Sequence, residues 1–223
     1  MLLKYIIQII IFRKIIKLLF ANYDYHTLFR SFFCLFISSF SFIASIYNWD
    51  KLLTNPFESN YLSLIINNLM ISYMLIDTGY FLFKQNYRME LIFHHVICIG
   101  FYGFYNDTGI LSFCAGCEIL SAFNWVGIIF PNLEWTSKLF RLYSILFIRL
   151  FIWVYTLVFL SNIKNIFLLA IGFGGVSCFI LLDIYWTWII IKNYFKYKNY
   201  IGCKIIKKKN KLIRKIKNSK KNN

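Results

Sequence analysis

Long apolar runs separated by short polar connections organise this chain. The runs cover Leu28–Tyr47, Leu62–Phe83, Met89–Tyr105, Thr108–Phe130, Leu139–Ser161 and Ile166–Ile191. A membrane-spanning helix needs roughly 17 to 25 mostly apolar residues, and a helix satisfies its own backbone hydrogen bonds without water. The runs lack the alternation that is typical of β-barrel strands. We therefore predict an all-α polytopic membrane protein with about six transmembrane helices, of which the third has the least certain limits.

The composition leaves no room for a sizeable soluble domain. Of the 223 residues, 59% are hydrophobic and 15% are charged, whereas typical soluble domains contain about 25% charged residues. We predict three parts: a cationic hydrophobic segment at residues 1–27, a transmembrane domain at residues 28–192, and a basic cytosolic tail at residues 193–223.

Two structures fit the N-terminal segment. Arg13, Lys14 and Lys17 fall on one side of a helix, so residues Lys4–Phe20 can form a helix that lies in the membrane interface. The alternative is a fraying hydrophobic terminus.

The positions of lysine and arginine predict the orientation in the membrane. With six spans, 22 of the 25 lysine and arginine residues lie on one side. Lys51 and Lys164 lie on the other side, and Arg149 falls within a span. Because positive residues mark the cytoplasmic face, we predict that both termini are cytosolic.

The formal net charge of +16 comes mainly from the tail. A polybasic segment directly after a membrane helix is attracted to anionic lipid headgroups, which we predict as a partner unless the tail is simply solvated. No nucleic-acid recognition fold accompanies the charge, so we expect no nucleic acid. Lys220 and Lys221 resemble the dilysine retrieval signal of endoplasmic reticulum membrane proteins. We therefore predict the endoplasmic reticulum or another endomembrane. The heavy use of Ile, Asn, Lys, Phe and Tyr is typical of A+T-rich genomes, such as those of protists or large DNA viruses, and for a virus the membrane would be a host's.

Ionisable side chains occur in every predicted span after the first. They are Asp77, Glu90, His94, His95, Glu118, Arg149 and Asp183. A charge at the bilayer centre is costly, and such residues almost always face a bundle interior or a cavity. We therefore predict that these groups share one polar interior.

Helix periodicity refines this interior. Glu90 and His94 are four residues apart and share a face, whereas His95 points about 100° away. Two neighbouring histidines and a carboxylate suit proton transfer, so His94, His95 and Glu118 are the candidate catalytic residues.

The remaining polar residues are assigned to the lining of the interior. The predicted lining includes Glu90, Asp77 and Asp183. We expect Asp77 and Asp183 mainly to hold helices in register. Glu118, Ser121 and Asn124 form a polar stripe on the fourth span. Arg149 needs an anionic partner, for which Glu118 is the first choice. We predict no metal site, because Cys114 and Cys117 lack a second pair and suit packing better.

Several of these residues resemble the TLC domain, the family of ceramide synthases, translocation-associated membrane proteins and other TLC-domain-containing proteins. The resemblance lies in Asp77 at the end of one span, followed by Arg88 and the pair His94-His95 in the next. Downstream segments also resemble the family: 117–125, with Glu118, Ser121 and Asn124; 147–150, with Arg149; and 182–186, with Asp183. Together the motifs cover residues 62–192.

The resemblance implies a helical barrel that encloses a lipid tunnel. Ceramide synthases carry a histidine-aspartate pair and a further aspartate where this chain has Cys117, Glu118 and Ser121. One acid is therefore replaced and the other is missing, which is closer to the less defined TLC-domain proteins.

Three functions fit the sequence. The first is a protein that binds or handles lipid and influences membrane lipid composition without catalysis. The second is a ceramide-synthase-like N-acyltransferase with acyl-CoA as co-substrate, in which His94 or His95 acts as base or nucleophile and Glu118 orients it. The third is a proton-coupled transporter, although only one span carries a glycine cluster.

Overall fold

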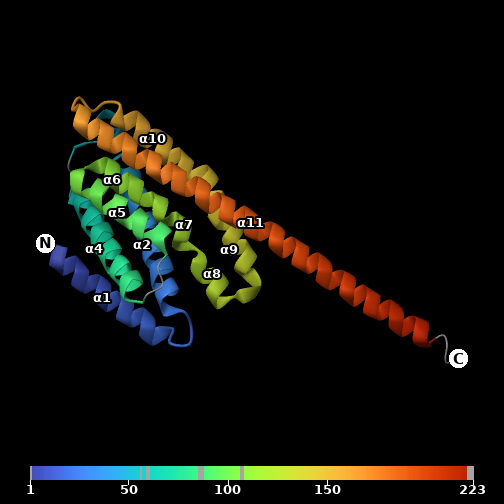
Figure 1. The fold of residues 1–223 in the computed structure, drawn as a ribbon. Helices are drawn as coiled ribbons and strands as arrows, with labels where there is room; N and C mark the ends of the chain where they lie inside the picture. The colour runs from blue at the N-terminus through green and yellow to red at the C-terminus, as the bar shows by residue number, and fades with distance from the viewer. Residues whose placement is uncertain (1, 56, 59–60, 85–87, 106–107, 220–223) are drawn as a thin grey trace. The chain divides into compact units, whose positions relative to one another are not determined.

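The computed structural model describes residues 2–55, 57–58, 61–84, 88–105 and 108–219, with side chains as far as residue 195. All regular elements in these ranges are helical (Figure 1). They are α1 (Leu2–Leu19), α2 (Tyr25–Tyr47), α3 (Trp49–Thr54), α4 (Tyr61–Phe83), α5 (Met89–Phe104), α6 (Gly109–Cys114), the 3₁₀ turn η1 (Ala115–Glu118), α7 (Ile119–Ala122), α8 (Asn124–Ile129), the 3₁₀ turn η2 (Pro131–Leu133), α9 (Glu134–Tyr143), the π-helical η3 (Ser144–Arg149), α10 (Leu150–Leu160) and α11 (Ile166–Ser219). The predicted all-α class is confirmed. The predicted dilysine signal lies outside the described residues.

Five helical segments are long and apolar enough to cross a membrane. They are Tyr25–Tyr47, Tyr61–Phe83, Gly109–Ile129, Pro131–Leu160 and Ile166–Phe195. They correspond to five of the six predicted spans. The remaining prediction coincides with α5, an apolar helix of 16 residues. At 1.5 Å per residue, α5 is roughly 24 Å long, which is shorter than the usual hydrocarbon core.

The chain divides into two compact units within α11. The first unit is Met1–Asp183 and the second is Ile184–Asn223. The second unit continues the helix and includes the predicted tail. Within it, Lys192 Nζ lies 4.6 Å from the centre of the Trp188 ring. The residues of the candidate site all belong to the first unit.

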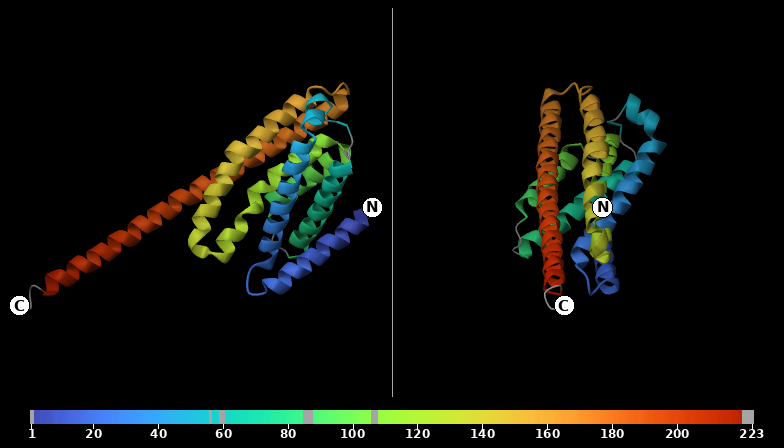
Figure 2. Two further views of the ribbon diagram at one scale, coloured as in Figure 1. Left: turned by 180° about the vertical axis from the view of Figure 1, so that it is seen from behind. Right: turned by 90° about the vertical axis from the view of Figure 1, so that its right-hand side faces the viewer.

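The N-terminal helix packs on the rest of the first unit. α1 lies alongside α4 and also contacts α2 (Figures 1 and 2). Ile9 and Ile16 are buried, and the Phe12 ring centre lies 5.9 Å from that of Phe29. Residues 2–19 therefore form a helix that packs on α2 and α4.

The central helix of the first unit is α2, which contacts α1, α4 and the segment α6–α8 (Figure 2, left). One face of α2 carries buried serines: Ser31, Ser38, Ser41 and Ser45. Small side chains let helices approach closely in a membrane. Ser41 Oγ donates a hydrogen bond to the Ser112 carbonyl of α6.

The predicted fourth span is broken near its middle. η1 interrupts it at Glu118, and a second break separates α7 from α8 at Phe123. Ser31 Oγ bridges this second break: it donates to the carbonyls of Ser121 and Ala122, at 2.9 and 2.8 Å, and accepts from the Trp125 N–H. Broken helices are tolerated at membrane depth where a neighbour satisfies the freed backbone groups.

Candidate functional site

The two adjacent histidines of α5 contact two different carboxylates. His94 Nε2 lies 3.5 Å from Glu118 Oε1, and His95 Nε2 lies 3.5 Å from Asp77 Oδ2. Thr78 Oγ1 lies 2.9 Å from His95 Nδ1. Both imidazoles are buried, with 6% and 2% of their surface exposed. Consecutive helix positions differ by about 100° in direction, which explains why the pair divides between two partners.

Asp77 is the centre of the first cluster and is fully buried. His26 Nε2 lies 2.9 Å from its Oδ1, and Arg30 Nε lies 3.0 Å from its Oδ2. His95 Nε2 also contacts Oδ2, so the carboxylate has partners on α2 and α5. A buried charge is tolerated when it is paired in this way.

The sequence analysis missed His26 and did not assign Arg30 to the interior. The predicted first span begins at Leu28, which left His26 in the N-terminal segment. In the structure α2 begins at Tyr25. Asp24 caps the helix, because its carboxylate accepts a hydrogen bond from the Thr27 N–H. The spacing of His26 and Arg30, four residues on one face, is the signal that could have revealed this pair.

Glu118 is the centre of the second cluster. It ends the 3₁₀ turn η1, and its side chain is 13% exposed. Glu118 contacts His94, and its Oε2 also accepts a hydrogen bond from Cys34 Sγ at 3.5 Å. A 3₁₀ stretch inside a helix often marks a functional site or a strained sequence.

Tyr73 and Cys34 connect the two clusters. Arg30 Nε donates to Tyr73 Oη at 3.4 Å, and Tyr73 Oη lies 3.8 Å from Cys34 Sγ. Since Cys34 also contacts Glu118, a chain of polar atoms runs from Asp77 to Glu118 through α2 and α4. We call these residues, with His26, His94 and His95, the buried polar network.

Arg149 forms its ion pair with a different carboxylate from the one we predicted. Arg149 Nη1 donates to Asp183 Oδ1, and Trp153 Nε1 donates to Asp183 Oδ2 at 2.9 Å. Glu118 was the first-choice partner of Arg149, but its ion pair is with His94. Arg149 ends η3, a π-helical segment, and such segments are frequent at functional sites.

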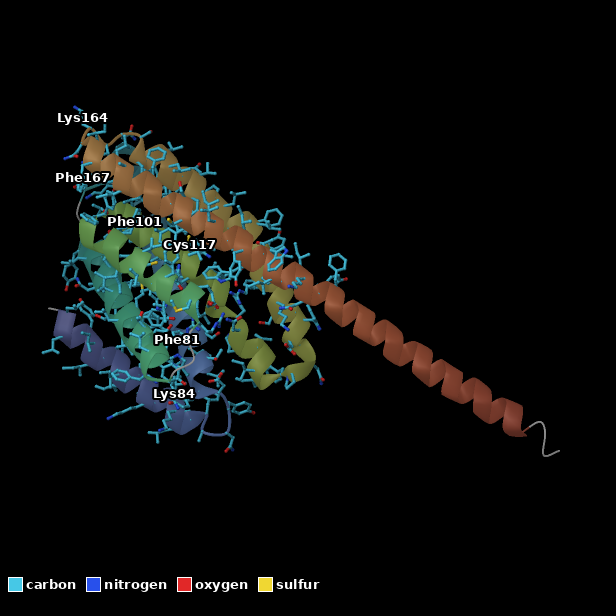
Figure 3. The ribbon with its side chains drawn as sticks, viewed as in Figure 1. Phe81, Lys84, Phe101, Cys117, Lys164 and Phe167 are labelled. Atoms are coloured by element: carbon cyan, nitrogen blue, oxygen red, sulfur yellow. The ribbon has the colours of Figure 1, made fainter. Side chains whose placement is uncertain are left out.

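A small cavity lies where His94, Glu118 and Arg149 converge. Its volume is about 20 Å³, and Cys117 and Phe101, both marked in Figure 3, are also among its lining residues. A cavity of this size holds roughly one water molecule and not an acyl chain. The interior at these residues therefore differs from the lipid tunnel that the resemblance implies.

The remaining predicted site residues lie elsewhere. Glu90, expected in the interior beside His94, lies partly exposed in the first turn of α5 and pairs with Arg88 at 2.8 Å. Ser121 and Asn124 are partly exposed on either side of the break between α7 and α8, so they do not form a continuous stripe with Glu118. Asp77 and Asp183 are buried in ion pairs that connect helices.

The cysteine pair packs between helices. Cys114 and Cys117 are both buried, and Cys114 Sγ lies 3.3 Å from Thr156 Oγ1 of α10. Among the described residues, no group of three or more His, Cys, Asp and Glu side chains is placed to hold a metal ion.

Comparisons with protein-family models, curated proteins and solved structures find no match for this chain. Its function must therefore be argued from the geometry. A histidine beside a carboxylate can accept and release a proton, and the carboxylate orients the ring. Two such pairs that share one buried network can exchange protons with each other or with a group that enters the interior.

Proposed function

We propose that this chain is a multi-pass membrane protein of TLC type that binds membrane lipid and influences membrane lipid composition. The proposal is supported by an apolar groove of about 550 Å³ between α1, α2 and α4. Ligand sites are typically mostly apolar and measure roughly 300 to 1,000 Å³. We call this the acyl groove; its apolar lining is Ile9, Phe12, Phe33, Phe36, Ile65 and Leu69.

Polar groups accompany the apolar lining. Lys4, Gln8 and Tyr61 also line the groove, and the exposed fractions of Phe36 and Tyr61 are 55% and 75%. An acyl chain fits the apolar part, while a lysine and a tyrosine suit the ester and phosphate region of a lipid. The chemistry of the groove therefore matches an amphipathic lipid.

The acyl groove adjoins the buried polar network. Phe33 in its wall stacks on Tyr73, with ring centres 4.3 Å apart. Tyr73 Oη in turn contacts Arg30 and Cys34. A lipid in the groove would thus lie one aromatic layer from groups that can transfer protons.

The His94–Glu118 pair favours a second candidate, an N-acyltransferase that uses acyl-CoA. In this reaction Glu118 orients the imidazole through His94 Nε2, which faces it, while the other ring nitrogen, Nδ1, takes the proton of an attacking lipid amine. The amine nitrogen forms the amide with the acyl carbon, the thioester C–S bond breaks, and the CoA thiolate receives the proton from His94.

Lipid cross-linking tests the first candidate. Cells that express the full chain would be fed a lipid with a photoactivatable acyl chain, and the cross-linked protein would be quantified beside the cellular lipid profile. Leu69→Trp fills the acyl groove and should abolish both the cross-link and any change in the profile. Leu150→Trp, at a position on α10 that is 53% exposed, is the matched control and should retain both. Equal cross-linking in the two variants would refute the groove as the lipid site.

An amide-forming assay separates the second candidate from the first. The purified chain would be incubated with acyl-CoA and a sphingoid amine. If His94 is the base, His94→Ala and Glu118→Gln should lower the rate by roughly 10²-fold or more. Glu90→Gln, which removes a carboxylate outside the network, should not. Lipid binding without catalysis would be favoured by two results together: the unsubstituted chain forms no amide product, and His94→Ala still cross-links to the lipid.

A further inference from the structure

A second hollow of the first unit lies beside α1 and is lined by different residues. It measures about 430 Å³ and is bounded by α1, the start of α2 and the second half of α4. Its lining includes Arg13, Tyr25, Leu75, Tyr80, Phe83 and Lys84. We call it the basic pocket. None of these residues lines the acyl groove.

Two tyrosine rings contact Arg13, one of the two cations that line the basic pocket. The Arg13 guanidinium lies 4.7 Å from the centre of the Tyr80 ring and 5.9 Å from that of Tyr25. Lys17 Nζ lies 5.5 Å from the Tyr25 ring. Lys84 follows the last turn of α4 and is exposed. Cation–π contact fixes the direction of a guanidinium without neutralising it.

None of the described residues that line the basic pocket is acidic, and Asp24 and Asp77 nearby have other partners. Asp24 uses both carboxylate oxygens to bind Thr27, at 2.6 and 3.3 Å. Asp77 is fully buried and paired with His26 and Arg30. Among the described residues, Arg13, Lys17 and Lys84 take part in no ion pair. The pocket therefore has a net positive charge that an anion from outside can neutralise.

Part of the lining of the basic pocket is apolar. Leu75 and Phe83 are 42% and 91% exposed, and Ile76 also lines the pocket. A side chain at Gly79 would meet no heavy atom within 4 Å, so the surface beside α4 is open there. A soluble anion would not contact this apolar surface, whereas the acyl chains of a lipid would cover it.

We propose that the basic pocket binds an anionic phospholipid of the cytosolic leaflet. The phosphate lies between Arg13 and Lys84, and the acyl chains cover Leu75 and Phe83. Basic pockets between membrane helices on the cytoplasmic side are suited to anionic headgroups, and the positive-inside distribution places Lys84 on that side. The proposal does not depend on lipid binding by the acyl groove.

The bound headgroup would lie close to the buried polar network. The Tyr80 ring stacks on His26, with centres 3.4 Å apart, and His26 contacts Asp77. Tyr80 thus separates Arg13 at the surface from His26 in the interior. A lipid that orders Arg13 and Tyr80 would also restrict His26.

Lipid selectivity of the purified full chain tests this proposal. Native mass spectrometry in detergent would measure the affinity for phosphatidylserine relative to phosphatidylcholine. Arg13→Gln and Lys84→Gln should each lower this ratio by roughly fivefold, since a cation near an anionic lipid contributes about 1 kcal/mol. Arg13→Lys, which keeps the charge, should retain most of the ratio.

The matched controls are Lys51→Gln and Lys164→Gln, each of which removes one positive charge, as Arg13→Gln and Lys84→Gln do. The basic tail is intact in every variant, so its attraction is constant. An equal fall in the controls would overturn the proposal, because bulk charge would then explain the selectivity. An unchanged ratio in Lys84→Gln would also overturn the proposal. Because Lys84 is exposed, this variant still tests the proposal if Arg13→Gln fails to fold.

Discussion

His26 Nε2 lies 2.9 Å from Asp77 Oδ1, and this contact joins the first turn of α2 to the last third of α4. The other oxygen of the same carboxylate contacts Arg30 and His95. One buried side chain of α4 therefore binds two residues of α2 and one of α5. A single carboxylate therefore connects these three helices.

Replacing Asp77 should destabilise the first unit strongly. Asp77→Ala leaves Arg30 buried without its carboxylate, and removing one partner of a buried ion pair costs roughly 3 to 5 kcal/mol. We expect a large fall in the thermal unfolding temperature of the protein in detergent. Glu90→Gln is the control, because Glu90 belongs to a partly exposed pair, and such pairs contribute at most about 1 kcal/mol. Similar unfolding temperatures for the two variants would contradict the central place of Asp77.

The Arg149–Asp183 pair should show strong coupling in a double-mutant cycle. Asp183→Leu alone leaves Arg149 charged and removes the acceptor of Trp153 Nε1, so we expect a loss of roughly 3 kcal/mol or more. Arg149→Met combined with Asp183→Leu removes both charges and should recover most of that loss. The free energy of unfolding in detergent checks this. Additive effects of the two substitutions would mean that the residues do not act as a pair.

Gly172 should not tolerate a methyl group. A Cβ atom there would lie 2.5 Å from Leu160 Cδ2 and 2.6 Å from Tyr105 Oη, whereas a Cβ at Gly174 would meet nothing within 4 Å. Overpacking typically costs roughly 1 to 3 kcal/mol. We therefore expect Gly172→Ala to lower the unfolding temperature and Gly174→Ala to leave it nearly unchanged. The opposite order would show that α11 does not approach α5 and α10 this closely.

Cysteine labelling should report opposite sides of the membrane at Lys84 and Lys164. Figure 3 shows these two residues at opposite ends of the helices of the first unit. The charge distribution predicts that Lys84 is cytosolic, so a membrane-impermeant thiol reagent added to intact microsomes should label Lys84→Cys but not Lys164→Cys. A background of Cys178→Ser and Cys203→Ser limits other labelling, because Cys34, Cys98, Cys114 and Cys117 are buried. Labelling of both positions without permeabilisation would contradict the predicted topology.

Local sequence properties were enough to predict the membrane-length helices and several groups of the interior, but not His26 or the helix breaks. Hydropathy depends on the residues of one segment, so the apolar runs predicted five of the membrane-length helices and a shorter sixth. Helix periodicity is also local, and it predicted that His94 and His95 would point in different directions. The choice of Glu118 and Asp77 as interior groups followed from the cost of burying a charge.

The pairing of those groups was decided by the tertiary structure. Arg149 contacts Asp183 because α10 and the first part of α11 pack together, and Glu118 is directed to His94 by the 3₁₀ turn. Such contacts depend on which helices are neighbours, and a single sequence carries no local record of that choice. The helix break after Ala122 also depends on a distant segment. Ser31 of α2 supplies hydrogen bonds that the broken helix loses there. Composition and period indicated that His94, His95, Asp77, Glu118, Arg149 and Asp183 belong to the interior, and only the packing of distant segments decided which partners satisfy them.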